Sequence, residues 1–533
     1  VIALCILHAL CRLLVKPPLG LDGETGLPSI LLAVSTAGLL TLLSLGMGNL
    51  LLRKSGLLTD CVILNTSLAL AAGYAMLSLC VFAGLTAPGG LNIGLPPALL
   101  IMGLGAWELF SRIHLMIPHG PGRDVWKGAT PLWSVLLAIL ALTALYMALT
   151  PPYSWDAQVY HLPIPAAYLE HRHFVPIPFN VYSNMPLAVD LLYVPALMLG
   201  GDIAAGLVHF ALGCSLVMLL YSAGRKWFSP EAGLIAALLF FCHPMVFYEW
   251  SVAFIDIGVA LFFLGAGICA FLWAETKKTG YAAVSGVLAG IGMGSKYTMV
   301  FGGLSLLLMY PFLPYILPRK GGGKEQQYTR RDVAAAFIAY GLAATLSTIP
   351  WLIKNTLYTG NPVYPLLYGI FGGRDWSAIQ SKWLLDWQRS IGMGREPLDY
   401  LLLPFRVFFL SDLTKGYRGF AGTLYPYILI LSPAVFALKD RGRRVALTCL
   451  VLFALFFIFW SLGAQQVRFL FPALAFLALC SGAAAAGLKD RSRIGGLVAG
   501  CLIMAACIHL CVGHIRTELR REGSFLRVIL GRQ

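Results

Sequence analysis

Charged residues are scarce in this chain of 533 residues: they make up 12% of it, whereas 58% of the residues are hydrophobic. Soluble domains carry about 25% charged residues, so the composition excludes an ordinary soluble protein. The apolar residues form continuous runs, and a run of about 17 to 25 residues crosses the hydrocarbon of a membrane as a helix. The runs do not alternate residue by residue, which excludes a transmembrane barrel. We therefore expect an all-α polytopic membrane protein.

Cysteine is nearly absent from the polar parts of the chain. Almost all of the 12 Cys lie in apolar runs, and neither of the two large polar loops contains one. This distribution argues against disulfides and cysteine metal sites, and it favours Cys as a small apolar side chain. A G-x-x-x-x-G-K-[ST] loop is also missing, which excludes a P-loop nucleotide site. No clear internal repeat is present, although many transporters contain one.

Acidic residues are fewer than basic ones, and the formal net charge is +15. The Lys and Arg gather in short loops between apolar runs, so we read them as topology signals and expect no nucleic-acid partner. The positive-inside rule makes the basic loops cytoplasmic, and each pair of them encloses an even number of spans. The loops that then face outward are 151–201, 243–252, 296–300, 354–419 and 463–468.

The apolar runs predict about 13 to 15 transmembrane helices, because one or two runs are fused or re-entrant. The runs are 1–15, 28–52, 62–85, 94–117, 131–150, 202–223, 231–248, 250–273, 281–297, 299–317, 332–353, 420–438, 444–462, 467–488 and 494–513. Residues 157–171, 186–199 and 374–410 mix apolar, aromatic and polar side chains, which predicts interfacial helices along the membrane surface. Val1 stands where Met is usual, so the true N-terminus stays open, and the first run has no cleavage site of a signal peptide.

Asp156 is the most informative acidic residue, because it stands where the span Pro131–Thr150 leaves the membrane. An ionisable group near a bilayer is costly, so it is a candidate functional residue. Asp156 would act as a general base that activates a hydroxyl group. A helix N-cap explains the same residue equally well, since an apolar run follows it.

Two further acids lie seven residues apart: Glu249 in an outward turn and Asp256 inside an apolar run. They share a face if one helix covers both. Asp156 and Asp256 together would offer oxygen ligands to a divalent cation, Mg²⁺ or Mn²⁺. The alternative for Asp256 is a buried carboxyl hydrogen-bonded to Tyr or Ser hydroxyls.

Two basic residues sit at the predicted outer surface, against the topology trend. Lys296 follows the glycines of Gly290-Ile291-Gly292-Met293-Gly294, which allow close helix packing, and Arg468 opens a span. Both side chains suit a phosphate group. Simple snorkelling of Lys296 and an isolated interfacial Arg468 are the alternatives.

Further polar candidates lie in or next to outward loops, and we expect them to bind substrate. They are Tyr160, His161, Asn184, Asp190, Glu249, Asn355, Tyr364 and Gln465. The segment that holds Asn355 and Tyr364 contains Gly360-Asn361-Pro362, which is strong turn chemistry and favours a structural role. His171 and His173 form a weak metal-binding pattern, and a solvated turn explains them better.

The order of these motifs resembles the GT-C superfamily of polytopic glycosyltransferases. The motifs are W-D-x-x-x-Y-H-L at Trp155, an in-span acid at Asp256, G-x-x-x-G-x-K-Y at Gly290, W-x-x-K-N-x-x-x-x-G-N-P-x-Y-P at Trp351 and Q-x-R-F-x-x-P at Gln466. The likeness covers roughly residues 131–488 and is greatest to bacterial lipid-linked-sugar transferases of the protein O-mannosyltransferase and lipid A aminoarabinose transferase type.

The resemblance implies an inverting hexosyl- or pentosyltransferase that takes a sugar from a polyprenyl phosphate on the outer side of a bacterial inner membrane. It implies Asp156 as base or as ligand of metal or acceptor, Asp256 or Glu249 as a second acid, and Lys296 and Arg468 on the lipid phosphate. Ala157 follows Asp156 where many relatives have a second acid, so protein O-mannosylation and metal dependence stay open. The acceptor is a lipid or glycan, and membrane lipids are partners.

The resemblance also divides the chain into an accessory membrane module at 1–125, a catalytic core at 126–490 and a C-terminal helix with a basic tail at 491–533. A transporter or lipid-linked-sugar flippase, an O-antigen ligase or polymerase, and a membrane scaffold remain alternatives. Placement of the polar residues on one face favours the enzyme, so we expect Asp156, Asp256, Lys296 and Arg468 to converge on one outward cavity.

Overall fold

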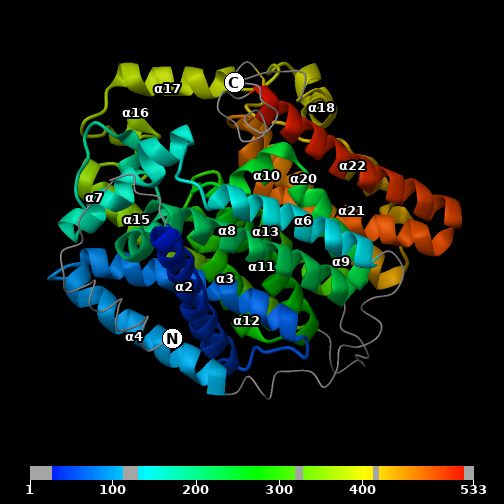
Figure 1. Cartoon of the computed structure of the whole chain (residues 1–533), viewed down its shortest axis with the longest axis horizontal. Coiled ribbons are helices and arrows are strands. Elements are labelled where there is room, and N and C mark those ends of the chain that lie inside the picture. Colours follow the sequence, from blue (N-terminus) through cyan, green and yellow to red (C-terminus); the bar gives the residue numbers. More distant parts are fainter. Residues whose placement is uncertain (1–26, 112–129, 318–327, 412–418, 521–533) are drawn as a thin grey trace.

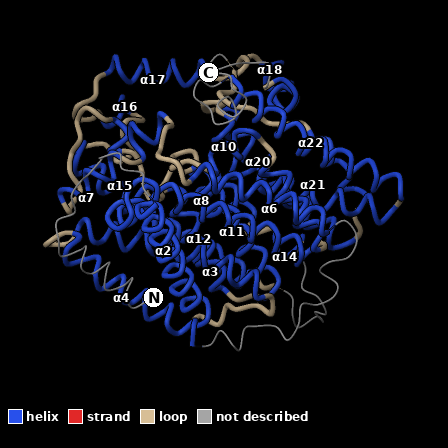
Figure 2. Tube along the Cα trace, in the orientation of Figure 1, coloured by secondary structure: helices blue, strands red, loops and turns tan. Residues whose placement is uncertain are grey.

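A computed structural model describes residues 27–111, 130–317, 328–411 and 419–520, and the side chains only as far as residue 514. Within these ranges the chain is helical and has no β-strand (Figure 2). Ten helices are long and apolar enough to cross a membrane, and an eleventh span results if the bent pair α9–α10 is counted as one. The chain is therefore an integral, multi-pass membrane protein of the all-α class, as its composition predicts.

The long helices follow the apolar runs closely. They are α2 (Leu27–Lys54), α3 (Val62–Thr86), α4 (Leu91–Ser111), α6 (Thr130–Ala148), α8 (Tyr193–Trp227), α11 (Asp256–Thr276), α15 (Arg330–Thr359), α20 (Asp440–Leu462), α21 (Phe471–Arg491) and α22 (Arg493–Arg520). The first predicted span, 1–15, lies outside the described residues. Three shorter apolar helices stand at Thr279–Met293 (α12), Met299–Met309 (α13) and Tyr427–Ala437, where full spans are predicted.

Burial separates central helices from peripheral ones. The apolar part of α11 is 100% buried and that of α21 is 94% buried, whereas the figure for α4 and α15 is 22%. Figure 1 shows α11 near the middle of the molecule, with α4 and α22 toward opposite sides. Because a peripheral helix in a membrane protein faces lipid, its exposed Leu and Ile side chains need no other cover.

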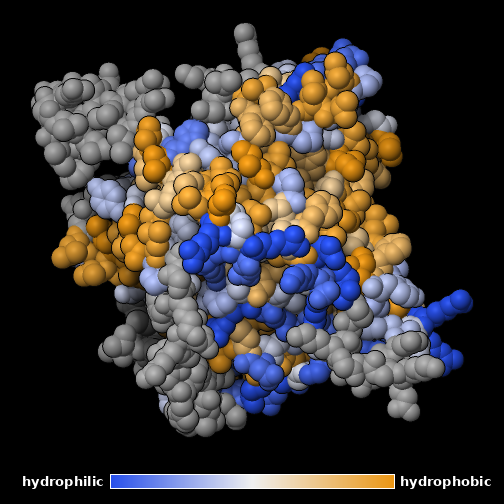
Figure 3. Space-filling view, turned by 90° about the vertical axis from the view of Figure 1, so that its right-hand side faces the viewer, coloured by the Kyte–Doolittle hydropathy of each residue, from blue (hydrophilic) through white to orange (hydrophobic). Residues whose placement is uncertain are grey.

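The N-terminal helices belong to the same core as the rest. Buried apolar side chains from Ala33 to Leu510 form one continuous cluster, and α2 and α3 both pack against α8. In a view turned by 90°, hydrophobic side chains occupy most of the upper part and hydrophilic ones gather across the lower middle (Figure 3).

Two glycines explain local features of the core. Gly201 has φ 76° and ψ −166°, which only glycine adopts readily, and it bends α8 where a predicted interfacial segment meets a predicted span. Gly290 faces α15 so closely that a Cβ there would lie 2.5 Å from the carbonyl oxygen of Ala344. The predicted close packing of the glycine-rich helix is thus present, and it fixes the turn that follows α12.

The spans predicted at 231–248 and 250–273 differ from the structure. The first is broken into α9 (Pro230–Phe241) and α10 (Pro244–Trp250), which meet at 90°. Pro244 at the start of α10 explains the break, because proline cannot continue the hydrogen bonding of the preceding helix. Glu249 and Asp256 therefore lie on different helices, so the condition under which they would share one helix face is not met.

Short helices lie between the long ones. They are a π-helix at Ala157–His161, α7 (Pro163–His171), 3-10 turns at Val181–Asn184 and Asp190–Leu192, α14 (Leu313–Ile316), α16 (Tyr368–Phe371), α17 (Ala378–Ser390), α18 (Pro397–Phe405), a π-helix at Arg406–Leu410, α19 (Tyr427–Leu431) and 3-10 turns at Ser432–Ala437 and Val467–Leu470. No side chain of α17 is buried, and α17 and α18 lie at the upper edge of Figure 1.

Candidate functional site

Two ion pairs form at the end of the bundle where α11 begins. Asp156, between α6 and the first π-helix, pairs with Arg468, which lies in the 3-10 turn before α21. Asp256, the first residue of α11, pairs with Lys296 in the turn between α12 and α13. Four stretches that are far apart in sequence therefore bring their charged side chains to one place.

The aromatic ring of Phe469 holds the two pairs side by side. The Lys296 ammonium lies 3.8 Å from the centre of the Phe469 ring. The Arg468 guanidinium lies 5.5 Å from the centre of the same ring and also 5.5 Å from the centre of the Phe254 ring. Cations over aromatic faces are stabilised where water is largely excluded. We refer to Asp156, Glu249, Asp256, Lys296 and Arg468 as the charge cluster.

Glu249 completes the charge cluster from the end of α10. Its side chain is fully buried, and neither carboxylate oxygen has a hydrogen-bond partner among the described residues. Asp256, Arg468 and Lys296 are all near enough to act on it electrostatically. A buried carboxyl group without hydrogen bonds is costly in free energy. Such a group is expected where a ligand completes the site.

The structure tests the N-cap reading of Asp156, whereas the reading as a general base stays a prediction. Its backbone is helical, and its side chain makes no capping hydrogen bond, so the N-cap reading is wrong. Burial raises the pKa of Asp156, but the neighbouring Arg468 outweighs this effect, and the pKa lies below its usual range. The hydroxyl of Tyr160 adds to the lowering. Asp156 is therefore an ionised carboxylate in a largely dry setting.

Tyr160 and His161 form a layer behind Asp156. Nδ1 of His161 lies 2.6 Å from Oδ1 of Asp190, and both side chains are buried. The ring of Tyr160 stacks on Tyr182 at 4.1 Å and contacts the ring of His161 at 4.2 Å. Burial raises the pKa of Tyr160 well above its usual value, so it remains a neutral donor. The His161–Asp190 pair therefore positions Tyr160, which faces Asp156.

Four predicted substrate-binding residues make contacts within the protein, and their binding of substrate stays a prediction. The Asn355 amide donates to the Tyr297 hydroxyl at 3.1 Å, and that hydroxyl donates to the backbone oxygen of Tyr364 at 2.8 Å. Gln465 is fully buried and donates to the backbone oxygen of Ser461 at 3.0 Å. Oδ1 of Asn184 accepts a hydrogen bond from Lys354 at 3.4 Å. These contacts brace the turns around the charge cluster, and none of the four joins it.

Lys354 is a buried cation that the sequence did not single out. Its ammonium donates to the backbone oxygen of Ser183 and to Asn184, and it lies 5.7 Å from the rings of both Phe174 and Tyr358. Only 4% of the residue is exposed, and no carboxylate pairs with it in the described part of the chain. The W-x-x-K-N motif contained a usable signal, because Lys354 directly precedes Asn355 in a lipid-facing helix.

The predicted divalent cation does not fit the site in this arrangement. Asp156 and Asp256 each already contact a basic side chain, so a metal ion would add positive charge next to Lys296 and Arg468. Within the described residues, no group of three or more His, Cys, Asp and Glu side chains could hold a metal ion. Metal dependence stays an untested prediction, and no chemical step below relies on a metal.

Comparison with known families matches part of the chain. Residues 193–321 match the family model described as dolichyl-phosphate-mannose-protein mannosyltransferase, and this segment contains Glu249, Asp256 and Lys296. An uncharacterized protein of Shigella flexneri is 26% identical over 132 residues, which are 24% of this chain and 65% of that relative. The match thus spans a little under two thirds of the relative's length. It agrees with the resemblance that the order of the motifs indicates.

Two solved membrane proteins have a distantly similar chain path. One is ArnT from Cupriavidus metallidurans bound to undecaprenyl phosphate, with a TM-score of 0.45 and 18% identity over 71% of this chain and 64% of that one. The other is the oligosaccharyltransferase AglB from Archaeoglobus fulgidus in complex with an inhibitory peptide and a dolichol-phosphate, with a TM-score of 0.41 and 15% identity over 71% and 55%. At this distance no residue correspondence is drawn from them.

Proposed function

We propose that this protein is a membrane glycosyltransferase that moves a sugar from a polyprenyl-phosphate donor to an acceptor hydroxyl on the extracytoplasmic side. The charge cluster is the observation that carries the proposal. It combines three carboxylates and two cations, all largely buried, at one end of the spanning helices. The matched mannosyltransferase family names a dolichyl-phosphate sugar as donor, which fits two basic side chains beside a base.

The reaction exchanges one bond for another at the anomeric carbon of the sugar. The acceptor oxygen forms a bond to this carbon while the bond from the carbon to the phosphate oxygen breaks. The lipid phosphate leaves with the bonding electrons, and the proton of the acceptor hydroxyl passes to Asp156. Attack opposite the leaving phosphate inverts the configuration. Lys296 and Arg468 stabilise the negative charge that develops on the phosphate.

Donor binding would also activate the base. While Arg468 pairs only with Asp156, it holds the pKa of this carboxyl low and makes it a weak base. A phosphate that binds Arg468 would share its positive charge, so the proton affinity of Asp156 would rise. A stronger base removes the acceptor proton more effectively. Asp156 would thus become competent only when the donor is in place.

Glu249 and Asp256 have separate roles in this scheme. Asp256 keeps Lys296 in place through their ion pair. Glu249, with both oxygens free of hydrogen bonds among the described residues, would accept hydrogen bonds from the sugar hydroxyls. Hexose and pentose donors remain open, as do lipid and glycan acceptors.

Replacement of Asp156 by Asn tests the assignment. Wild-type membranes incubated with radiolabelled mannosyl or aminoarabinosyl polyprenyl phosphate should transfer label to an endogenous lipid or glycan, and the Asp156→Asn variant should lose about 10²- to 10⁴-fold in rate. Asp386→Asn, on the exposed surface of α17, is the matched control and should retain full activity. Unchanged transfer in Asp156→Asn would remove Asp156 from the mechanism.

A binding measurement makes the test independent of the sugar. Polyprenyl phosphate without a sugar should raise the unfolding temperature of the purified wild type, since a ligand that binds only the folded state stabilises it. The Arg468→Gln variant should lose most of this rise. A wild type that polyprenyl phosphate does not stabilise would contradict the proposed donor.

A further inference from the structure

A second polar region lies at the far ends of the helices that carry the charge cluster. α11 begins at Asp256 and ends at Thr276, about 30 Å away for 21 residues. A groove of about 650 Å³ lies there, between the loop that joins α2 to α3 and the ends of α8, α11 and α12. The loops that border it are basic and are predicted to be cytoplasmic. This groove is thus distinct from the proposed transferase site.

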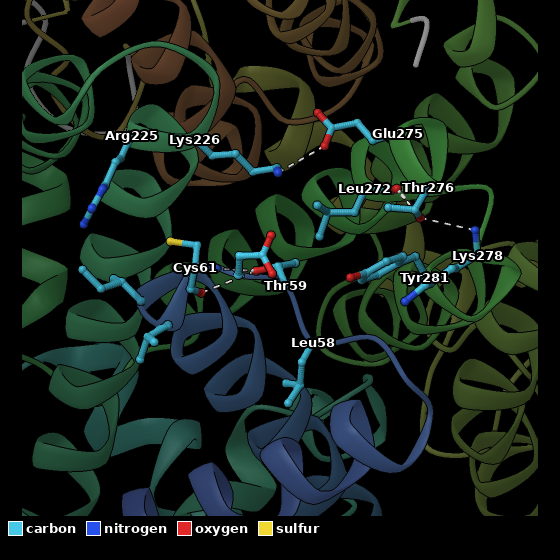
Figure 4. A pocket seen from close by; sticks show the side chains of 13 residues that line it. Leu58, Thr59, Cys61, Arg225, Lys226, Leu272, Glu275, Thr276, Lys278 and Tyr281 are labelled. Atoms are coloured by element: carbon cyan, nitrogen blue, oxygen red, sulfur yellow. Dashed lines mark hydrogen bonds and ion pairs between the residues drawn. The ribbon is translucent and has the colours of Figure 1, made fainter. Parts of the chain in front are cut away.

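The lining residues combine charged and apolar side chains (Figure 4). They are Leu58, Thr59, Asp60, Cys61, Val62, Ile63, Arg225, Lys226, Leu272, Glu275, Thr276, Lys278 and Tyr281. The hydroxyl of Tyr281 donates to the backbone oxygen of Leu57 at 2.5 Å, which anchors α12 to the loop on the other side of the groove. The volume lies within the range of about 300 to 1,000 Å³ that is usual for small-ligand sites.

Positive charge exceeds negative charge in the groove. Glu275 is already occupied: Lys226 pairs with it at 3.2 Å, Arg441 pairs with its other oxygen, and the Trp227 ring nitrogen donates to it. Lys278 donates to the backbone oxygen of Gly56 at 2.5 Å, which leaves its charge unbalanced. Arg225 has no ion pair in the part of the chain that the structure describes. The exposed Asp60 is the remaining carboxylate.

We propose that this groove binds a phosphate-bearing anion, either the headgroup of an anionic phospholipid or a free phosphate compound. At one side of the groove Arg225 would bind phosphate oxygens with two parallel N–H groups, and Lys278 adds positive charge at the opposite side (Figure 4). The groove lies where spanning helices end, which is the level of lipid headgroups. Its apolar wall of Leu58, Val62 and Leu272 would accommodate the first carbons of an acyl chain. Basic pockets at this level attract acidic lipids.

The test uses the purified full chain in phosphatidylcholine nanodiscs. One series replaces phosphatidylcholine with phosphatidylglycerol, and a second adds inorganic phosphate to pure phosphatidylcholine discs. The unfolding temperature reports binding in both. Stabilisation by phosphatidylglycerol alone would identify the lipid headgroup as the ligand, and stabilisation by inorganic phosphate as well would identify the free anion.

Three variants assign any effect to the groove. Arg225→Gln/Lys278→Gln should weaken binding about tenfold or more, since charged hydrogen bonds are lost. Arg225→Lys/Lys278→Arg keeps both charges and should largely preserve binding. Lys54→Gln/Lys439→Gln removes two exposed cations outside the groove and should match the wild type. All should keep their sugar-transfer activity, so this test is independent of the proposed function.

A wild type that neither anion stabilises would overturn the proposal. It would equally fail if the Arg225→Gln/Lys278→Gln variant bound both anions as tightly as the wild type does. Circular dichroism in anion-free discs checks that each variant is folded.

Discussion

The charged side chains at the two ends of α8 and α11 differ in burial and in ion pairing. At the end with the charge cluster, Asp156, Asp256, Lys296 and Arg468 are mostly buried, and each has a partner of opposite sign. At the end with the groove, Arg225 and Lys278 are exposed and lack an acidic partner in the described chain. Water screens exposed charges, so they tolerate isolation, whereas a buried charge requires compensation. The four following predictions test this difference, in order of expected effect.

Loss of Arg468 should give the largest change in stability. Arg468→Met leaves Asp156 with a negative charge in a largely buried place, and an uncompensated buried charge costs about 3 kcal/mol. Arg225→Met removes an exposed cation and should change the free energy of unfolding by less than about 0.5 kcal/mol. Equilibrium unfolding in detergent micelles measures both. Equal losses would show that burial does not distinguish the two ends.

Removal of both partners should be milder than removal of one. Lys296→Met and Asp256→Leu should each destabilise the protein by about 2 to 3 kcal/mol, because each leaves its partner unpaired. The double variant should recover to within about 1 kcal/mol of the wild type, since two apolar side chains can replace a buried pair. Sugar transfer should stay lost in the double variant. Additive losses in the double-mutant cycle would mean that Asp256 and Lys296 do not interact.

A fall in pH should change the stability of the wild type and that of Arg468→Met in opposite directions. Arg468 holds the folded-state pKa of Asp156 below its unfolded value, so the pair contributes fully above about pH 4 and its contribution is lost as the pH falls further. In Arg468→Met, burial is the largest remaining influence on Asp156, and it should outweigh the Tyr160 hydroxyl and raise the pKa. The variant should therefore become relatively more stable as the pH falls from about 7 to about 4. Unfolding temperatures across this range give the difference, and parallel curves would count against the pair.

Among the substitutions of buried charged residues, Lys354→Met should have the smallest effect on stability. Lys354 is buried but has no carboxylate partner in the described residues, so its removal leaves only a carbonyl and an amide oxygen without a donor. We expect a loss of about 1 kcal/mol, well below that of Lys296→Met. Sugar transfer should fall because the segment around Asn184 loses its anchor to α15. Ala at position 354 provides the contrast, since it also leaves a cavity and should cost more stability.

The order of the spans could be predicted because it depends on local information. A continuous apolar run forms a helix in a membrane whatever its neighbours are, since its backbone has no other hydrogen-bond partners there. The break between α9 and α10 was missed because apolar residues continue on both sides of Cys242 and His243. Pro244 marked the position, but hydropathy alone did not distinguish a broken span from a straight one.

The sequence predicted which residues form the site better than it predicted which of them pair with each other. Asp156, Asp256, Lys296 and Arg468 stood out because charged residues are rare beside apolar runs. Which acid pairs with which base could not be read from the chain, as Asp156 and Arg468 are 312 residues apart. The roles of Asn355, Tyr364 and Gln465 stay predictions, because a polar residue in a predicted outward loop can bind a ligand or simply brace the loop. Lys354 was missed although it lies within a motif.

Composition and the positions of the apolar runs were enough to establish a helical membrane protein whose rare acids and bases lie mainly near the ends of the runs. Both properties follow from the free-energy cost of placing unpaired backbone groups and charged side chains in hydrocarbon. This cost applies to each segment separately, whatever its neighbours are. Only the packing of α11 against its neighbours decided that Asp256 meets Lys296, that Asp156 meets Arg468, and that Glu249 has no hydrogen-bond partner among the described residues. Such pairings depend on where distant segments meet, and the local sequence does not determine this.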